Sequence, residues 1–97
     1  MKIRVRRRAQ RQIREARAWW AVNRPEAPLA VERELEQTLK RLSEFPLAGS
    51  LFPRSRIDGI RQSYLRHIHY HLYYRVTSDA VEILALWHAS RGTPPPI

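Results

Sequence analysis

The sequence contains no cysteine, and it has only nine acidic residues against eighteen basic ones. Without cysteine the chain can form neither a disulfide framework nor a thiolate metal site. This fits a reducing compartment, and we expect a cytoplasmic protein. No apolar run approaches the length of a transmembrane helix, and no apolar region of a secretory signal follows the basic N-terminus. The sequence also lacks a glycine-rich phosphate loop, a nucleophile elbow and a paired carboxylate site.

Basic residues dominate what is present. The formal net charge is +9, and all the basic residues except Lys2 and Lys40 are arginine. Arginine forms bidentate contacts with phosphate and carboxylate groups and stacks on aromatic rings. The composition therefore predicts a polyanionic partner, which could be nucleic acid, a nucleic-acid enzyme or an acidic protein. The alternative is a charged surface that serves solubility alone. One basic cluster, suited to docking an acidic partner or nucleic acid, is formed by Arg6, Arg7, Arg8, Arg11 and Arg14.

Hydrophobic periodicity divides the chain into strands and helices. Period two indicates strands, and a spacing of three to four residues indicates helices. The expected elements are, in order, a strand at 2–6, a helix at about 8–22, a helix starting between 25 and 28 and ending near 45, and strands at 60–66, 70–76 and 81–87. Residues 46–59 are expected to form a loop, and 92–97 a proline-rich tail.

This order predicts a single α+β domain over residues 1–97. We expect an N-terminal strand and an antiparallel helix hairpin that packs on one face of a mainly antiparallel four-stranded sheet. Residues 81–87 are almost wholly apolar, so they should form a central strand buried on both faces. The opposite face of the sheet is expected to remain open.

The run from His67 to Val76 alternates between apolar and polar residues, so one side of it should carry three imidazoles, a phenol and a guanidinium. Histidines two apart on a strand lie about 7 Å from each other and are parallel rather than convergent. Because no acidic residue completes a ligand set, we expect neither a metal site nor a cofactor. One of the histidines could act as a general acid or base. Alternatively, all three are ordinary exposed residues.

Several segments of the chain together resemble the RelE/ParE superfamily of type II toxin–antitoxin toxins. The likeness covers nearly the whole chain and comprises the helix pair with Trp20 and the Leu35/Leu39/Leu42 stripe, Pro46–Gly49, Tyr70–Val76 and Val81–Arg91. The resemblance implies one of two activities. RelE-type toxins cut mRNA in the ribosomal A site, and ParE-type toxins inhibit DNA gyrase and occur in plasmid-stabilisation operons.

The residues of the cleaving branch are matched only in part. By resemblance, His71 falls where an arginine of the third strand stabilises the transition-state phosphate, Arg91 matches an arginine of the last strand, and Arg66 falls on the second strand. The C-terminal tyrosine of that branch has no counterpart, because the sequence ends in Pro94–Ile97. The segment Leu86–His88, followed by Arg91, looks more like the ParE-type branch.

We therefore expect a ParE-like toxin that binds DNA gyrase without chemistry of its own. A cognate acidic antitoxin would neutralise it in a hetero-oligomer. Candidate contacts to the target or to nucleic acid are Arg61, Arg75, Tyr73 and His69. The alternative is a ribosome-dependent mRNA endonuclease, whose catalytic residues would be His71, His88, Arg66 and Arg91. A third hypothesis is a basic nucleic-acid-binding module or an inactive relative of the toxins.

Overall fold

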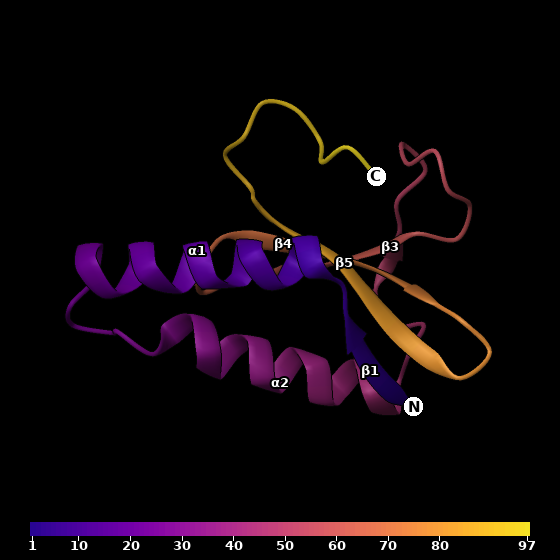
Figure 1. Cartoon of the computed structure of the whole chain (residues 1–97), viewed down its shortest axis with the longest axis horizontal. Helices are drawn as coiled ribbons and strands as arrows, with labels where there is room; N and C mark the ends of the chain where they lie inside the picture. Colours follow the sequence, from indigo (N-terminus) through magenta and orange to yellow (C-terminus); the bar gives the residue numbers. More distant parts are fainter.

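Two helices pack against one face of a five-stranded sheet (Figure 1). The computed structural model describes all residues from Met1 to Ile97. The elements are β1 (Lys2–Val5), α1 (Arg7–Asn23), α2 (Ala30–Glu44), β2 (Ser50–Leu51), β3 (Arg61–Leu65), β4 (Tyr70–Val76) and β5 (Ala80–His88). The strand order is β1-β5-β4-β3-β2; β1 is parallel to β5, and the other neighbours are antiparallel. The α+β class is confirmed, and the sheet has one strand more than predicted.

The extra strand, β2, contains only two residues and pairs with the start of β3. It lies in the segment that we expected to be a loop. Two residues are too few to produce a periodic hydrophobic pattern, so the sequence gives no signal for this strand.

The two helices form the antiparallel hairpin that was predicted (Figure 1). Helix α2 begins at Ala30 rather than at the prolines before it. Successive turns occupy that segment instead, closed by hydrogen bonds from Ala27 N–H to Arg24 C=O and from Ala30 N–H to Ala27 C=O. An ion pair between Arg17 of α1 and Glu32 of α2 links the helices at a distance of 2.5 Å.

The main core lies between the helices and the sheet, and we call it the helix-side core. Its twelve buried residues are Ala9, Ala16, Val31, Leu35, Leu42, Leu65, Ile68, Leu72, Tyr74, Val81, Ile83 and Leu86. They come from both helices and from β3, β4, β5 and the turn after β3. The apolar stripes of both predicted helices and one side of the alternating run therefore meet in one core.

Tyr74 supplies the polar anchor of this core. Its ring is fully buried, its hydroxyl donates to Pro46 C=O at 2.9 Å, and the same oxygen accepts from Gly49 N–H at 2.8 Å. A Cβ atom at Gly49 would lie 2.5 Å from this hydroxyl and 2.7 Å from Gln62 C=O. Only glycine fits at this position, because the Cβ atom of any other residue would collide with Tyr74 of β4 and with the backbone of β3.

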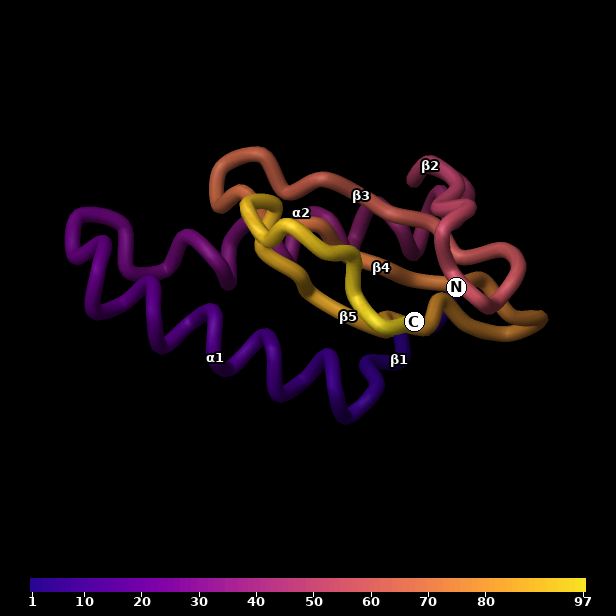
Figure 2. Tube along the Cα trace, turned by 90° about the horizontal axis from the view of Figure 1, so that it is seen from above, coloured from indigo at the N-terminus to yellow at the C-terminus, as the bar shows by residue number.

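The opposite face of the sheet is largely covered, contrary to expectation. Residues 52–60 and the proline-rich tail lie over it, and Figure 2 shows the tail passing above β4 and β5. We call the small core beneath them the tail-side cluster; it consists of Phe52, Ile60, Tyr73 and Ala85, with Leu84, Trp87 and Ile97 packed against it. A loop and a tail carry no periodic signal, so the sequence could not predict this cover.

A bulge in β5 produces the tail-side cluster. Tyr73 lies opposite Ala85 and Tyr74 lies opposite Ile83, so Leu84 is an extra residue in β5. The alternation therefore shifts by one, and both Leu84 and Ala85 face the tail. The prediction that this central strand is buried on both faces is confirmed.

Neither helix has the length and apolar character that crossing a lipid bilayer requires.

Candidate functional site

A hollow of about 320 Å³ opens between the tail and the exposed end of the sheet, and we call it the tail-side hollow. It is lined by Phe52, Pro53, Arg54, Gln62, His71, Tyr73, Trp87, His88, Ala89, Arg91, Gly92, Thr93 and Pro94. Three of the four residues predicted for a nuclease, His71, His88 and Arg91, lie in it. Gln62 reaches it from β3, although the sequence pattern gave no reason to select this residue.

Strand register and the turn after β5 build this hollow. His71 pairs with Trp87 across β4 and β5, so the two side chains are neighbours on one face. Trp87 Nε1 donates to Thr93 C=O at 2.8 Å, which holds the tail over the ring. The guanidinium of Arg91 stacks on the same ring at 3.9 Å from its centroid. The ring of Trp87 therefore fixes the position of the Arg91 guanidinium through a cation–π contact.

His71 stands half-buried at the floor of the hollow, with its ring 5.0 Å from that of Tyr64 and 6.1 Å from that of Tyr73. Its Nδ1 atom is buried and has no hydrogen-bond partner. Burial lowers the pKa of His71 below its usual value of about 6.5, because an imidazolium loses hydration there. The ring is therefore neutral at neutral pH and could accept a proton from a bound group.

His88 has only one free nitrogen. Its Nδ1 atom lies 3.1 Å from the backbone N–H of Ser90 and 2.6 Å from the hydroxyl of the same residue. The edge of the ring meets Tyr70 at a centroid distance of 4.9 Å. Nε2 is therefore the nitrogen that a ligand could reach.

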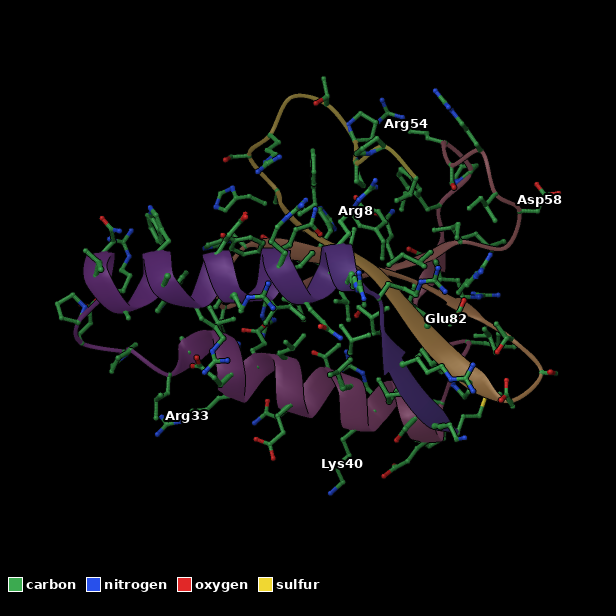
Figure 3. The ribbon with its side chains drawn as sticks, viewed as in Figure 1. Arg8, Arg33, Lys40, Arg54, Asp58 and Glu82 are labelled. Atoms are coloured by element: carbon green, nitrogen blue, oxygen red, sulfur yellow. The ribbon has the colours of Figure 1, made fainter.

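Arg66, the fourth predicted nuclease residue, lies elsewhere. It lines a separate hollow beside α2, together with Glu34, Gln37, Thr38, Arg41, Tyr64 and His67. The structure therefore does not bring Arg66 together with the other three, and the cation opposite Arg91 in the tail-side hollow is Arg54. Figure 3 shows Arg54 on the loop beside the tail.

The three histidines of the alternating run do not share one side of a strand, and this part of the prediction is wrong. Strand β4 begins only at Tyr70, and His69 adopts a positive φ of 61° in the turn before it. His67 binds Glu34 through its backbone N–H at 3.0 Å and its ring Nδ1 at 3.1 Å. His69 contacts the hydroxyl of Tyr64 at 2.9 Å. No group of three histidine, acidic or cysteine side chains is placed to hold a metal ion.

Three of the four predicted target contacts are engaged within the fold. Arg61 donates to Gly49 C=O at 2.7 Å, and Arg75 donates to Glu82 at 2.7 Å. Tyr73 is 4% exposed and packs against Phe52 at a centroid distance of 4.9 Å. His69 is the exposed member of the set.

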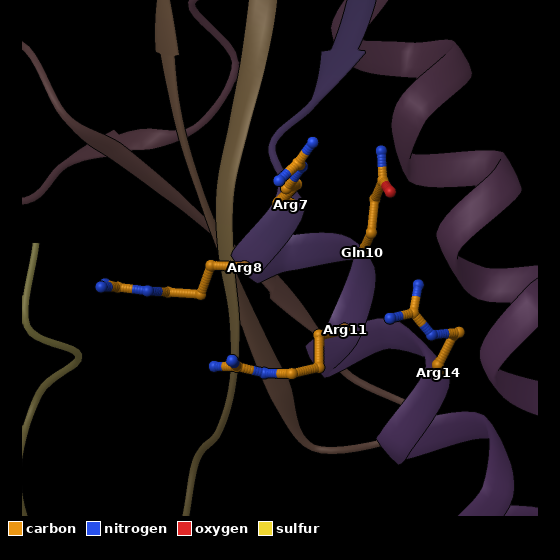
Figure 4. Close-up of a pocket in the computed structure, with 5 residues that line it drawn as sticks. All are labelled: Arg7, Arg8, Gln10, Arg11 and Arg14. Atoms are coloured by element: carbon orange, nitrogen blue, oxygen red, sulfur yellow. The ribbon is translucent and has the colours of Figure 1, made fainter.

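Charged and aromatic side chains gather on two further surfaces. One, which we call the edge groove, runs between α1 and β5 and is lined by Gln12, Glu15, Ala16, Trp19, Tyr70, Leu86, His88 and Arg91. The other, which we call the arginine face, lies on the exposed side of α1 and consists of Arg7, Arg8, Gln10, Arg11 and Arg14 (Figure 4). Apolar and cationic groups are mixed in the edge groove, whereas the arginine face has no apolar side chain.

Comparisons with known proteins agree with the fold. A search of curated proteins found no match. Among solved structures, the chain is similar to one described as the chromosomal ParDE TA system from P. aeruginosa, with a TM-score of 0.76 and 21% sequence identity. The similarity covers 93% of this chain and 97% of that chain. At this identity the likeness establishes the fold.

A family model described as the ParE toxin of the type II toxin-antitoxin system, parDE, matches residues 3–92. This range includes both helices, every strand except the first residue of β1, and the start of the tail. The chain therefore belongs to the ParE toxin family of type II toxin–antitoxin systems.

Proposed function

We propose that this ParE-type toxin inhibits growth by binding DNA gyrase and that it performs no chemistry of its own. The observation that carries the proposal is the separation of the candidate nuclease residues, because Arg66 lies outside the hollow that holds His71, His88 and Arg91. Cleavage of a phosphodiester needs a base, an acid and cations converging on one phosphate. The family of the chain supports the same conclusion.

The contact with gyrase would include the exposed cations at the rim of the tail-side hollow, Arg54 and Arg91, together with His69. These side chains are exposed, whereas Arg61, Arg75 and Tyr73 are held by the fold. Arg91 is already fixed against Trp87, so little side-chain entropy would be lost when it meets a partner.

The test uses two double variants of the purified full chain in a gyrase supercoiling assay. The variant His71→Ala/His88→Ala removes both candidate acid–base groups and is expected to inhibit supercoiling as strongly as the parent. The matched variant Arg54→Gln/Arg91→Gln keeps both histidines and is expected to inhibit at least tenfold more weakly. If the parent chain does not inhibit supercoiling, or if the histidine variant loses this inhibition while the arginine variant keeps it, the proposal is wrong.

The second candidate function is ribosome-dependent mRNA cleavage, which the gathering of His71, His88 and Arg91 in one hollow favours. The neutral imidazole of His71 could take the proton of a 2′-hydroxyl, and Arg91 with Arg54 could stabilise the charged transition state. Under this alternative, His71→Ala/His88→Ala would abolish codon-phased cleavage of ribosome-bound mRNA.

A cognate acidic antitoxin would neutralise the toxin by placing an amphipathic segment in the edge groove. The groove offers Trp19 and Tyr70 to apolar side chains and Arg91 to carboxylates, over a base formed by the buried Leu86. Such a mixture matches the anchor residues and charged flank of a helix or strand bound in a groove. The +9 net charge of the chain would also speed association with an acidic partner.

The antitoxin proposal is tested by comparing two exposed apolar residues of α1. Trp19 lines the edge groove, whereas Val22, which is 80% exposed, does not. Trp19→Ser should weaken binding of the cognate antitoxin by at least tenfold, and Val22→Ser should leave this affinity within twofold of the parent value. Equal losses from both variants would place the antitoxin elsewhere.

A further inference from the structure

The arginine face of α1 gathers four arginines around one hollow, and neither proposed partner occupies it. Its residues border an open hollow of about 510 Å³, and the close-up in Figure 4 shows their side chains projecting from the first turns of the helix. Arg7, Arg11 and Arg14 recur at a spacing of three to four, so they form one stripe. The buried residues Ala9 and Ala16 lie on the opposite side of α1.

The fold makes little use of these arginines. Arg7 and Arg14 take part in no ion pair and no side-chain hydrogen bond. Arg11 approaches Glu15 only to 3.7 Å, and both of those side chains are exposed. Arg8 donates to Pro96 C=O at 3.1 Å and so borders the tail. Removing Arg7 and Arg14 would therefore break no contact that supports the fold.

Their position also opposes the helix dipole. The N-terminal end of a helix carries a partial positive charge and favours acidic residues. Helix α1 has no acidic residue in its first turn, whereas Arg7 and Arg8 begin it. Helix α2 follows the favourable pattern, with Glu32 in its first turn and Arg41 in its last. Folding alone thus gives no reason to concentrate arginine at this end of α1.

The lining of the arginine face identifies the chemistry of its partner. Peptides and single-stranded nucleic acids bind through apolar anchors or aromatic stacking, and the residues of the arginine face supply neither. The nearest apolar side chains, Ile57, Leu84 and Ile97, line the adjoining hollow that shares Arg7 and Arg8. Guanidinium groups alone suit phosphates, which they bind in a bidentate manner. Arg7 and Arg14 are seven residues apart, about 10 Å along the helix. The phosphates of one strand recur about every 3.4 Å of the axis of B-DNA, so a stripe lying along that axis could span about three of them.

We propose that the arginine face binds the phosphate backbone of duplex DNA without reading its sequence. A surface helix can approach both rims of the wide major groove of B-DNA, whereas the major groove of duplex RNA is narrow and deep. This inference goes beyond the gyrase and antitoxin proposals and does not depend on either. A toxin with this property would be held near the DNA on which a topoisomerase works.

The test measures fluorescence anisotropy of a labelled DNA duplex of mixed sequence with the purified full chain, in the absence of gyrase. The logarithm of the association constant should fall with the logarithm of salt concentration with a slope of about −4 if four arginines contact phosphates. Arg7→Gln/Arg14→Gln should reduce the slope to about −2 and weaken binding at least tenfold at about 100 mM salt.

A charge-matched control removes two cations from the exposed side of α2. Figure 3 shows Arg33 and Lys40 pointing away from this helix, on the side remote from Arg8. Arg33→Gln/Lys40→Gln should leave DNA affinity within about twofold, because only the arginine face meets phosphates. If both double variants weaken binding equally, the effect is one of net charge and the proposal is overturned.

A second variant separates binding from folding. Arg7→Glu supplies the acidic residue that the first turn lacks, so it should raise the melting temperature while it weakens DNA binding. Three results would overturn the proposal: no DNA binding by the parent chain, tighter binding to an RNA duplex of the same sequence, or a loss of antitoxin binding in Arg7→Gln/Arg14→Gln with DNA binding intact. The last result would make the arginine face a protein-docking surface.

Discussion

The two faces of the sheet are built from alternate residues of the same strands, yet they differ in what they contribute. The helix-side core contains twelve buried residues and is sealed by two helices, whereas the tail-side cluster contains four and is covered by a loop and a tail. The tail side carries the hollow in which His71, His88, Arg54 and Arg91 meet. One face thus holds most of the core and leaves the other free to carry function.

The sharpest test of this division uses neighbouring residues of β4. Leu72 is fully buried in the helix-side core, and His71 faces the tail-side hollow. Leu72→Ala should cost about 2–5 kcal/mol of unfolding free energy, because it leaves a cavity among packed side chains. His71→Ala should cost less than about 1 kcal/mol, since it breaks no hydrogen bond. Urea denaturation measures both, and equal losses would contradict the division.

A smaller effect is expected from the hydroxyl of Tyr74. Tyr74→Phe leaves Pro46 C=O and Gly49 N–H without their partner, so it should cost about 1–3 kcal/mol. The control is Tyr64→Phe, because the hydroxyl of Tyr64 contacts only His69 at the surface. This change should alter the free energy of unfolding by no more than about 0.5 kcal/mol. Thermal unfolding of the two variants side by side would show whether the buried hydroxyl is the one that matters.

A pH-dependent effect is expected at Glu82, the buried acidic residue of β5. The hydrogen bond from Arg75 lowers the pKa of Glu82, and the nearby guanidinium of Arg6 adds to the shift. A depressed folded-state pKa stabilises the protein above the unfolded value of about 4.3 and ceases to do so as pH falls through the folded value. Glu82→Gln should therefore be less stable than the parent at neutral pH, and the gap should close below about pH 4. A gap of constant size in pH-dependent denaturation would show that the charge of Glu82 is not its source.

The smallest change in stability is expected at the rim of the tail-side hollow. Arg91→Gln removes an exposed cation that stacks on Trp87, which should cost about 0.5–1 kcal/mol. Arg54→Gln should cost within about 0.5 kcal/mol, because its side chain is exposed. Growth inhibition should nevertheless fall in both variants. If either Arg91→Gln or Arg54→Gln remained fully toxic, the target would bind to another surface.

Periodicity was a sufficient guide to the helix side of the molecule. The apolar stripe of α2 and the apolar residues of β4 were predicted from their spacing alone. Apolar residues on a face that packs against another element must recur with the period of the helix or strand that carries them. The central position of β5 followed from its nearly unbroken apolar run. The basic cluster around the start of α1 was also visible in the sequence, although the absence of ion pairs at Arg7 and Arg14 was not.

The tail side could not be predicted in the same way. Its shape depends on the extra residue Leu84 in a strand that is apolar throughout, and no pattern marks such a bulge. The positive φ of His69 ended the alternation before β4, which separated His67 and His69 from His71. Arg66 could not be excluded from the hollow until the turn after β3 was placed. Sites made by turns and tails depend on tertiary contacts that sequence spacing does not record.

The central claim is that the toxin acts by binding gyrase, and a paired measurement tests it most directly. The full chain is induced in a bacterial host without antitoxin while ribosome-bound mRNA is mapped, and the purified protein is added to a gyrase supercoiling reaction. We predict loss of supercoiling with intact mRNA. Codon-phased cleavage of mRNA with normal supercoiling would contradict the account and would make His71, His88 and Arg91 catalytic residues.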